Sequence, residues 1–153
     1  MTDIMRSLLL HLLKLLGIIA AVVVALIALA IGAFLYLIPD PCGNEVLSEV
    51  VAPGGRLKAV VFERDCGATT GFSTQVSILP VAEALPNKAG NVLVVDDDHG
   101  KAPSGPGGGP ALRVSWLSDH QIRIEHHPDT RVLRSESEYG NIGLEYVAAT
   151  PQE

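Results

Sequence analysis

One apolar segment near the N-terminus constrains this chain more than any other feature. From Leu15 to Ile38, 24 consecutive residues carry no charged or strongly polar side chain. A helix of this length rises about 1.5 Å per residue and is roughly 36 Å long, which is enough to cross a hydrocarbon core of about 30 Å with some tilt. The sequence therefore predicts a transmembrane helix over residues 15–38, with the lipid bilayer as its partner.

The charges on either side of this segment predict its orientation. Arg6 and Lys14 precede it, whereas the three residues that follow, at 39–41, read Pro-Asp-Pro and carry no positive charge. Positively charged flanks favour the cytoplasmic side of a membrane. We expect residues 1–14 in the cytoplasm and the C-terminal domain in the periplasm or outside, in a single-pass protein of the bacterial inner membrane.

The length of the apolar segment also bears on whether it is cleaved. Ala28 and Ala30 form an A-x-A match to a signal-peptide cleavage site. The apolar part of a signal peptide has only about 7 to 15 residues, however, and eight further apolar residues follow Ala30. A retained signal anchor is favoured, with cleavage after Ala30 as the alternative.

Small residues recur along this predicted helix at spacings of three and four. They are Ala21, Ala25, Ala28 and Gly32. Such a stripe lets two membrane helices approach closely, which predicts a weak homodimer. The alternative is that alanine is simply tolerated in lipid.

The chain has two cysteines, Cys42 and Cys66. Two cysteines in a domain that faces an oxidising compartment are expected to pair. Lipidation of Cys42 is a poorer interpretation, because Asp40 and Pro41 stand where small and apolar residues normally precede a lipoprotein cysteine. A reactive thiol at Cys66 would need a positioned base, and no histidine lies in a recognisable catalytic motif. The sequence thus predicts a disulfide bond between Cys42 and Cys66.

A disulfide at this place would leave only residues 39–41 as a tether between lipid and the folded domain. Three residues reach about 10 Å at most, and two prolines stiffen them further. We therefore expect the disulfide end of the domain to lie nearest the headgroups and the contact surfaces to be lateral or distal.

Residues 42–150 predict one β domain, followed by a tail at 151–153. Short alternating apolar runs bounded by glycine, proline, asparagine or aspartate are typical of strands. They occur at 47–51, 57–63, 75–79, 113–116, 122–125, 131–134 and 142–146. Residues 91–95 are apolar on both faces, as expected of a central strand. The turn residues at 53–55 and 118–120 favour two hairpins. No stretch after residue 40 has a helical period, so the expected fold class is mainly β: an N-terminal transmembrane α-helix followed by a small antiparallel sheet or sandwich.

One long loop interrupts the strand pattern at 96–110, with the sequence DDDHGKAPSGPGGGP. Its glycine and proline content predicts a mobile, solvated segment. Binding residues often lie on loops held by a rigid sheet. The candidate binding residues are therefore those at its start: Asp96, Asp97, Asp98, His99 and Lys101. The alternative is a plain connector between two strands.

The same polar residues do not predict a metal or cofactor. The acidic run lacks the spacing of a calcium loop, and consecutive residues leaving a strand point in different directions. His126 and His127 are adjacent, so on a strand their rings would point to opposite faces. The SGPGGGP run lacks the lysine and the following helix of a phosphate loop.

The charge of the outer domain excludes one class of partner. From residue 39 onward there are 16 acidic and 9 basic side chains, a net charge of −7, with no basic stripe. Nucleic acid is therefore not an expected partner.

Several motifs resemble those of small, uncharacterised bacterial envelope proteins with an N-terminal anchor. These motifs are CGNE, VVFERDCGATTGFSTQVSIL, a GNV strand and a WLSD turn, within residues 42–147. The resemblance implies a membrane-anchored envelope protein built on a domain of unknown function, and it implies no activity.

Three functions follow from these observations. The leading hypothesis is a non-enzymatic, membrane-anchored binding or assembly domain with an envelope protein as partner. A periplasmic immunity or inhibitor protein, acidic and clipped by a disulfide, is the second. An envelope hydrolase that uses His99, His126 or Cys66 is the third.

Overall fold

The computed structural model describes residues 2–37, 41–67 and 70–149. They belong to two compact units, one ending at residue 40 and the other starting at residue 41. The predicted tether at 39–41 lies mostly outside the described residues, and the predicted tail at 151–153 lies entirely outside them.

The first unit is a single helix, α1 (Thr2–Leu37), of 36 residues. The helix therefore begins before the predicted start at Leu15, and the described part of the expected cytoplasmic segment is helical as well. Residues Met5–Leu37 are long and apolar enough to cross a membrane, and every side chain in that range is exposed.

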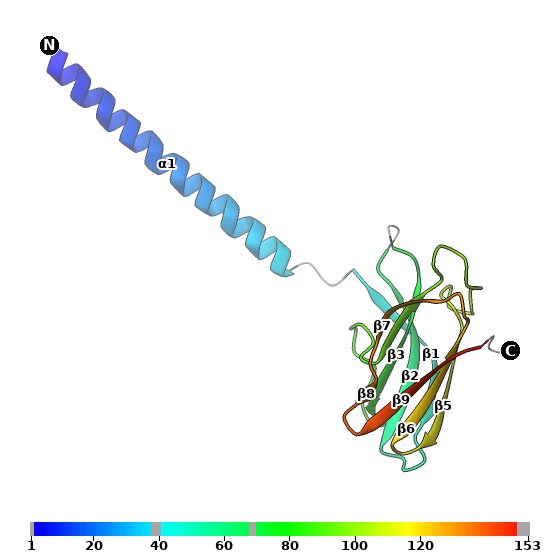
Figure 1. Cartoon of the computed structure of the whole chain (residues 1–153). Helices are drawn as coiled ribbons and strands as arrows, with labels where there is room; N and C mark the ends of the chain where they lie inside the picture. Colours follow the sequence, from blue (N-terminus) through cyan, green and yellow to red (C-terminus); the bar gives the residue numbers. More distant parts are fainter. Residues whose placement is uncertain (1, 38–40, 68–69, 150–153) are drawn as a thin grey trace. The chain divides into compact units, whose positions relative to one another are not determined.

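The second unit is a β-sandwich of two sheets (Figure 1). The first sheet has the order β1-β2-β3-β4-β7 and the second has the order β5-β6-β9-β8. Their bounds are β1 (Gly43–Val51), β2 (Leu57–Asp65), β3 (Ser73–Pro80), β4 (Leu93–Asp96), β5 (Leu112–Ser118), β6 (Gln121–His126), β7 (Arg131–Ser135), β8 (Glu138–Tyr139) and β9 (Ile142–Ala148). The expected class, an apolar helix followed by a small sandwich-like domain, is confirmed.

The sheets differ from the sequence expectation in two details. β6 and β9 pair in parallel, whereas the sequence predicted antiparallel pairing. The chain crosses to the first sheet as β7 after β6 and returns through β8, so β9 runs beside β6 in the same direction. β8 was not predicted, because two residues are too few to show an alternating pattern.

Two predicted hairpins are confirmed, and their turns are joined to each other. β1 and β2 are linked through a turn in which Gly55 has a φ of +69°, a conformation that favours glycine. β5 and β6 are linked through a turn at residues 119–120. The carboxylate of Asp119 accepts a hydrogen bond of 2.5 Å from the backbone N–H of Gly54. This bond ties a hairpin of one sheet to a hairpin of the other.

The main core lies between the two sheets. The first sheet and its flanking residues contribute Ala59, Val61, Val76, Ile78, Val92, Leu93 and Val95, and the second sheet contributes Ile122, Ile124 and Ile142. Burial of each large aliphatic side chain contributes roughly 1.5–3 kcal/mol. Along each strand the residues of this core occur at every second position, because successive side chains point to opposite faces of the sheet. Each sheet therefore presents one apolar face to the other, and these two apolar faces pack against each other.

A second, smaller core covers the outer face of the first sheet. Val60, Phe62 and Leu79 are buried there, with Leu85 of the β3–β4 connection packed against them. β2 is consequently buried on both faces along most of its length. The first sheet is the central layer of the domain, and it positions the disulfide and the pocket described below.

Candidate functional site

The predicted disulfide is present: Cys42 and Cys66 are bonded, and neither cysteine is free. The β1–β2 register pairs Gly43 with Asp65, so the two cysteines lie directly opposite one another at the open end of this hairpin. Both sulfur atoms are engaged. Cys66 is therefore not available as a thiol nucleophile in this structure.

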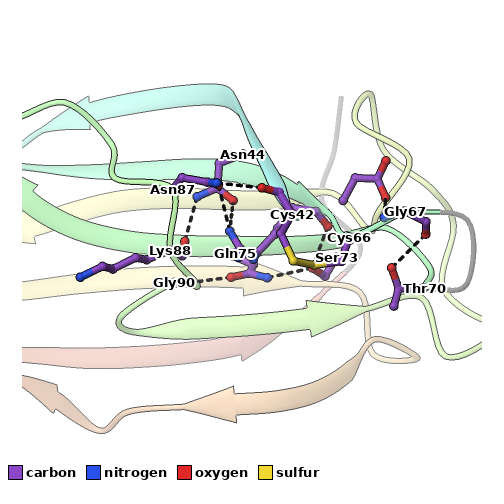
Figure 2. The surroundings of a disulfide bond; sticks show 12 residues. Cys42, Asn44, Cys66, Gly67, Thr70, Ser73, Gln75, Asn87, Lys88 and Gly90 are labelled. Carbon is purple, nitrogen blue, oxygen red and sulfur yellow. Dashed lines mark hydrogen bonds between the residues drawn. A yellow bond between two sulfur atoms is a disulfide. The ribbon is translucent and has the colours of Figure 1, made fainter. Parts of the chain in front are cut away.

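A polar network holds the β3–β4 connection beside the disulfide (Figure 2). The guanidinium of Arg64 donates to the side-chain oxygens of Asn44, at 2.7 Å, and of Asn87, at 3.2 Å. The amide of Asn44 donates to two backbone carbonyls of the connection, and that of Asn87 donates to the carbonyl of Cys42 at 2.8 Å. These side chains satisfy one another and the backbone, which gives them a structural role.

Two of the three aspartates at the start of the predicted binding loop form ion pairs. Asp96, at the end of β4, pairs with Arg131 of β7, and this hydrogen bond lowers the pKa of the Asp96 carboxyl. Asp98 pairs with Lys101, whose ammonium lowers the pKa of Asp98. His99 is exposed, with a φ of +61°. The structure thus places four of the five candidate residues near one another as a charge-balanced turn, and Asp97 follows Asp96 with no ion pair in the described residues.

The second half of this loop is packed in part, because Gly109 and Pro110 are buried whereas Pro103, Ser104 and Pro106 are exposed, so the segment is not solvated throughout. Ala102 is 1% exposed and Pro110 is also buried. The backbone of Gly109 lies so close to β3 that an added Cβ would stand 2.6 Å from Thr74 Oγ1 and 3.0 Å from the Thr74 backbone nitrogen. The glycines are required by this close approach, since any side chain would collide with the sheet.

Three histidines of the sandwich, including His126 of the hydrolase hypothesis, are held in separate polar contacts. His126 Nδ1 lies 2.9 Å from the carbonyl oxygen of His127, and His127 Nδ1 accepts from the backbone N–H of Asp129 at 3.2 Å. His120 contacts the side chain of Asn141. Across the described ranges, no three histidine, cysteine, aspartate or glutamate side chains converge as metal ligands would.

Sequence reasoning missed an acidic pocket at the disulfide end of the β1–β2 hairpin. Glu45 of β1 stands directly opposite Glu63 of β2, and Gly43 stands opposite Asp65. Residues two apart on a strand share a face, so the three carboxylates line one pocket of about 330 Å³ together with Gly43 and Gly67. The alternation Glu63-x-Asp65 opposite Gly43-x-Glu45 was visible in the sequence, but it becomes meaningful only once the hairpin register is known.

Glu63 is the most deeply placed of these acids. It is 8% exposed, and burial, followed by repulsion from Glu45 and Asp65, raises the pKa of its carboxyl. An added Cβ at Gly107 would stand 2.4 Å from Glu63 Oε2 and 2.9 Å from a methyl carbon of Leu47. The glycine-rich part of the loop at 96–110, residues 105–110, is called the glycine loop. It closes over Glu63 and leaves the carboxylate between this loop and the pocket.

An apolar groove of about 230 Å³ lies next to this acidic pocket. It is lined by Leu47, Val61, Pro106, Pro110 and Leu112, among others, and by Gly107. Gly107 thus borders the groove while contacting Glu63, which lines the pocket. An acidic recess beside an apolar groove suits a ligand that has a cationic group on an aliphatic stem.

Comparison with known proteins does not add to this picture. No protein-family model, curated protein or solved structure matches the chain.

Proposed function

We propose that this chain is a single-pass protein of the bacterial inner membrane, whose β-sandwich acts outside the cytoplasm as a non-enzymatic binding or assembly domain. The observation that carries the proposal is α1. Thirty-three residues of this helix are apolar enough to cross a membrane, and all of their side chains are exposed. An apolar surface of this extent is unstable in water and is satisfied by lipid.

Two further observations support the orientation. Arg6 and Lys14 lie in the N-terminal part of α1, and positive residues favour the cytoplasmic side. The Cys42–Cys66 bond suits an oxidising compartment, because cytosolic thiols are normally kept reduced. Together they favour an N-terminus inside and a sandwich outside.

The absence of a catalytic constellation among the described side chains favours binding over catalysis. Both cysteines are bonded, His11 and His126 contact backbone carbonyls, His120 contacts Asn141, and His127 contacts Asp129. A nucleophile needs a positioned base, and none of these contacts provides such a pair. The partner we infer is an envelope protein, and inhibition of a periplasmic toxin is one form that such binding would take.

The test of this proposal is topology combined with partner capture. Alkaline phosphatase fused after Glu153 should be active in a bacterial host, and a fluorescent protein that folds only in the cytoplasm should be dark at the same position. The mature protein should retain α1 by intact mass. An inactive phosphatase with a bright cytoplasmic reporter would reverse the orientation, and cleavage after Ala30 would remove the anchor. If no protein co-purifies stoichiometrically from detergent, the binding role is wrong.

A further inference from the structure

We propose that Glu45, Glu63 and Asp65 form a receptor pocket for the lysine or arginine side chain of a partner polypeptide. This inference rests on the proposed binding function and names the chemistry of its partner. The pocket lies at the disulfide end of β1 and β2, on the face that carries Val61 and Ala59 further along β2.

The arrangement of these acids is unfavourable for the domain alone. Glu45 and Glu63 are directly opposed on neighbouring strands, and like charges in this position destabilise a sheet. Asp65 adds a third negative charge on the same face. Gly43 stands opposite Asp65 and has open space where a side chain would be, which leaves room for a ligand.

The position of Glu63 also favours a cationic ligand. Glu63 as a whole residue is 8% exposed, and its carboxylate lines the pocket. Among the residues that the structure describes, no hydrogen bond or ion pair reaches this carboxylate, although a buried charge is normally paired. A cation entering the pocket would supply that partner. Glu63 is thus a buried acceptor directed at an open recess.

The basic residues of the same hairpin are directed elsewhere. Arg64 alternates to the opposite face of β2, where its guanidinium binds Asn44 and Asn87. Lys58 binds Glu49 at 3.0 Å. Neither of these two bases neutralises the pocket, and we assign that role to a cation of another molecule.

The chemistry of the surroundings selects a basic side chain rather than a metal ion. No metal-binding group of three side chains is found in the described ranges, and about 330 Å³ is far more space than one ion fills. Lysine and arginine carry their charge on an aliphatic stem that packs along apolar surface, and the groove beside Leu47 and Gly107 offers such a surface. A partner segment with an apolar residue next to a basic one would occupy both.

The test uses the full chain in detergent micelles, labelled with ¹⁵N, and a defined peptide. The probe is acetylated and amidated Gly-Leu-Arg-Leu-Gly, and its matched control carries citrulline, which has the shape of arginine without the charge. The arginine peptide should shift the amide resonances of Gly43, Glu45 and Glu63. The citrulline peptide should bind roughly tenfold more weakly or not at all, because a tenfold change corresponds to one charge-assisted contact of about 1.4 kcal/mol.

The variants locate the effect within the pocket. Glu63→Gln keeps the side-chain shape and should weaken the arginine peptide by about tenfold. Glu83→Gln removes one negative charge from an exposed position on the β3–β4 connection, so it should leave the affinity within about twofold while matching the net charge. Trp116 fluorescence checks that both variants are folded.

Several outcomes would overturn the proposal. They are no shift at the pocket with millimolar peptide, equal binding of the citrulline peptide, or equal weakening by Glu63→Gln and Glu83→Gln. A calcium chloride titration that shifts the same resonances more tightly than the peptide would assign the pocket to a metal ion instead. A co-purifying partner that binds Glu63→Gln with unchanged affinity refutes the pocket and leaves the binding function standing. A reversed topology refutes the function and does not alter the peptide result.

Discussion

Removing the disulfide should destabilise the sandwich by an amount that the structure lets us calculate. Cys42 and Cys66 are 24 positions apart and close a loop of about 25 residues. The chain-entropy treatment then gives roughly 3.5 kcal/mol of stabilisation through restriction of the unfolded chain. The native contacts next to the bond, such as the 2.8 Å hydrogen bond from Asn87 to the carbonyl of Cys42, do not need the sulfur atoms. The double variant Cys42→Ser/Cys66→Ser should therefore fold and lose stability mainly through its unfolded state.

Trp116 makes this measurement selective for the sandwich. It is the single tryptophan of the chain, it lies half-buried on β5, and its indole N–H donates to the carbonyl of Val50 on β1 at 2.9 Å. Its fluorescence in urea, with the full chain in micelles, reports separation of the two sheets and not of α1. With a slope of about 1–3 kcal/mol per molar urea, the midpoint should fall by roughly 1–3.5 M.

Two controls make the result decisive. Reduction of the wild-type chain should move the midpoint as far as the double variant does, because both remove the same constraint. The slope should stay similar in the folded variant if only stability has changed. A loss below about 1 kcal/mol would show that the hairpin already holds these ends together in the unfolded chain, and the entropy argument would fail.

Three further perturbations test the packing and the charges. Gly109→Ala should lower the free energy of unfolding in urea by about 1–3 kcal/mol, because the added Cβ meets backbone atoms of β3. Gly71 has open space around it, so Gly71→Ala should change stability by less than about 0.5 kcal/mol. Equal effects of the two substitutions would contradict the packed loop. Glu63→Gln should stabilise the domain at neutral pH. This gain in stability should shrink as the pH falls through the raised pKa of the folded carboxyl toward its ordinary 4.5, because protonation of Glu63 removes the buried charge from the wild type as well. A gain in stability that does not depend on pH would refute this. Arg131→Gln should raise the pKa of the Asp96 carboxyl toward its ordinary 3.8, which NMR can follow. The ion pair stabilises the fold while Asp96 is ionised. The stability lost in the variant should therefore be complete above pH 3.8 and should disappear as the pH falls through the lowered pKa. An unchanged Asp96 titration would mean that the ion pair does not form in solution.

Local pattern was enough to predict the elements of this chain. The apolar run at 15–38 predicted a helix because lipid imposes a minimum length, and α1 contains its described part. Alternating residues predicted strands because the two faces of a sheet meet different surroundings. Even the weak run at 131–134 forms an edge strand, β7. The pairing of Cys42 with Cys66 needed only arithmetic, since two cysteines allow one bond.

The path of the chain decided the rest. Nothing local indicates that Gly107 lies against Glu63, 44 positions earlier, because that contact depends on how the loop returns over the sheet. The same glycine content that predicted mobility is what allows the backbone to approach β2 and β3 so closely. The charge-balanced turn likewise needed β7 beside β4, which brings Arg131 to Asp96.

The sequence by itself therefore determined the helix and each described strand except the short β8, where the hairpin turns lie, and that the two cysteines pair. The tertiary structure alone decided that the glycine loop is packed, that β6 and β9 run in parallel, and that Glu45, Glu63 and Asp65 share one pocket. The physical reason is the range of the interactions. Propensity and alternation act over a few residues, whereas strand order and loop return are fixed by burial across the whole domain, and only that burial makes Glu63 a buried acid instead of one more surface charge.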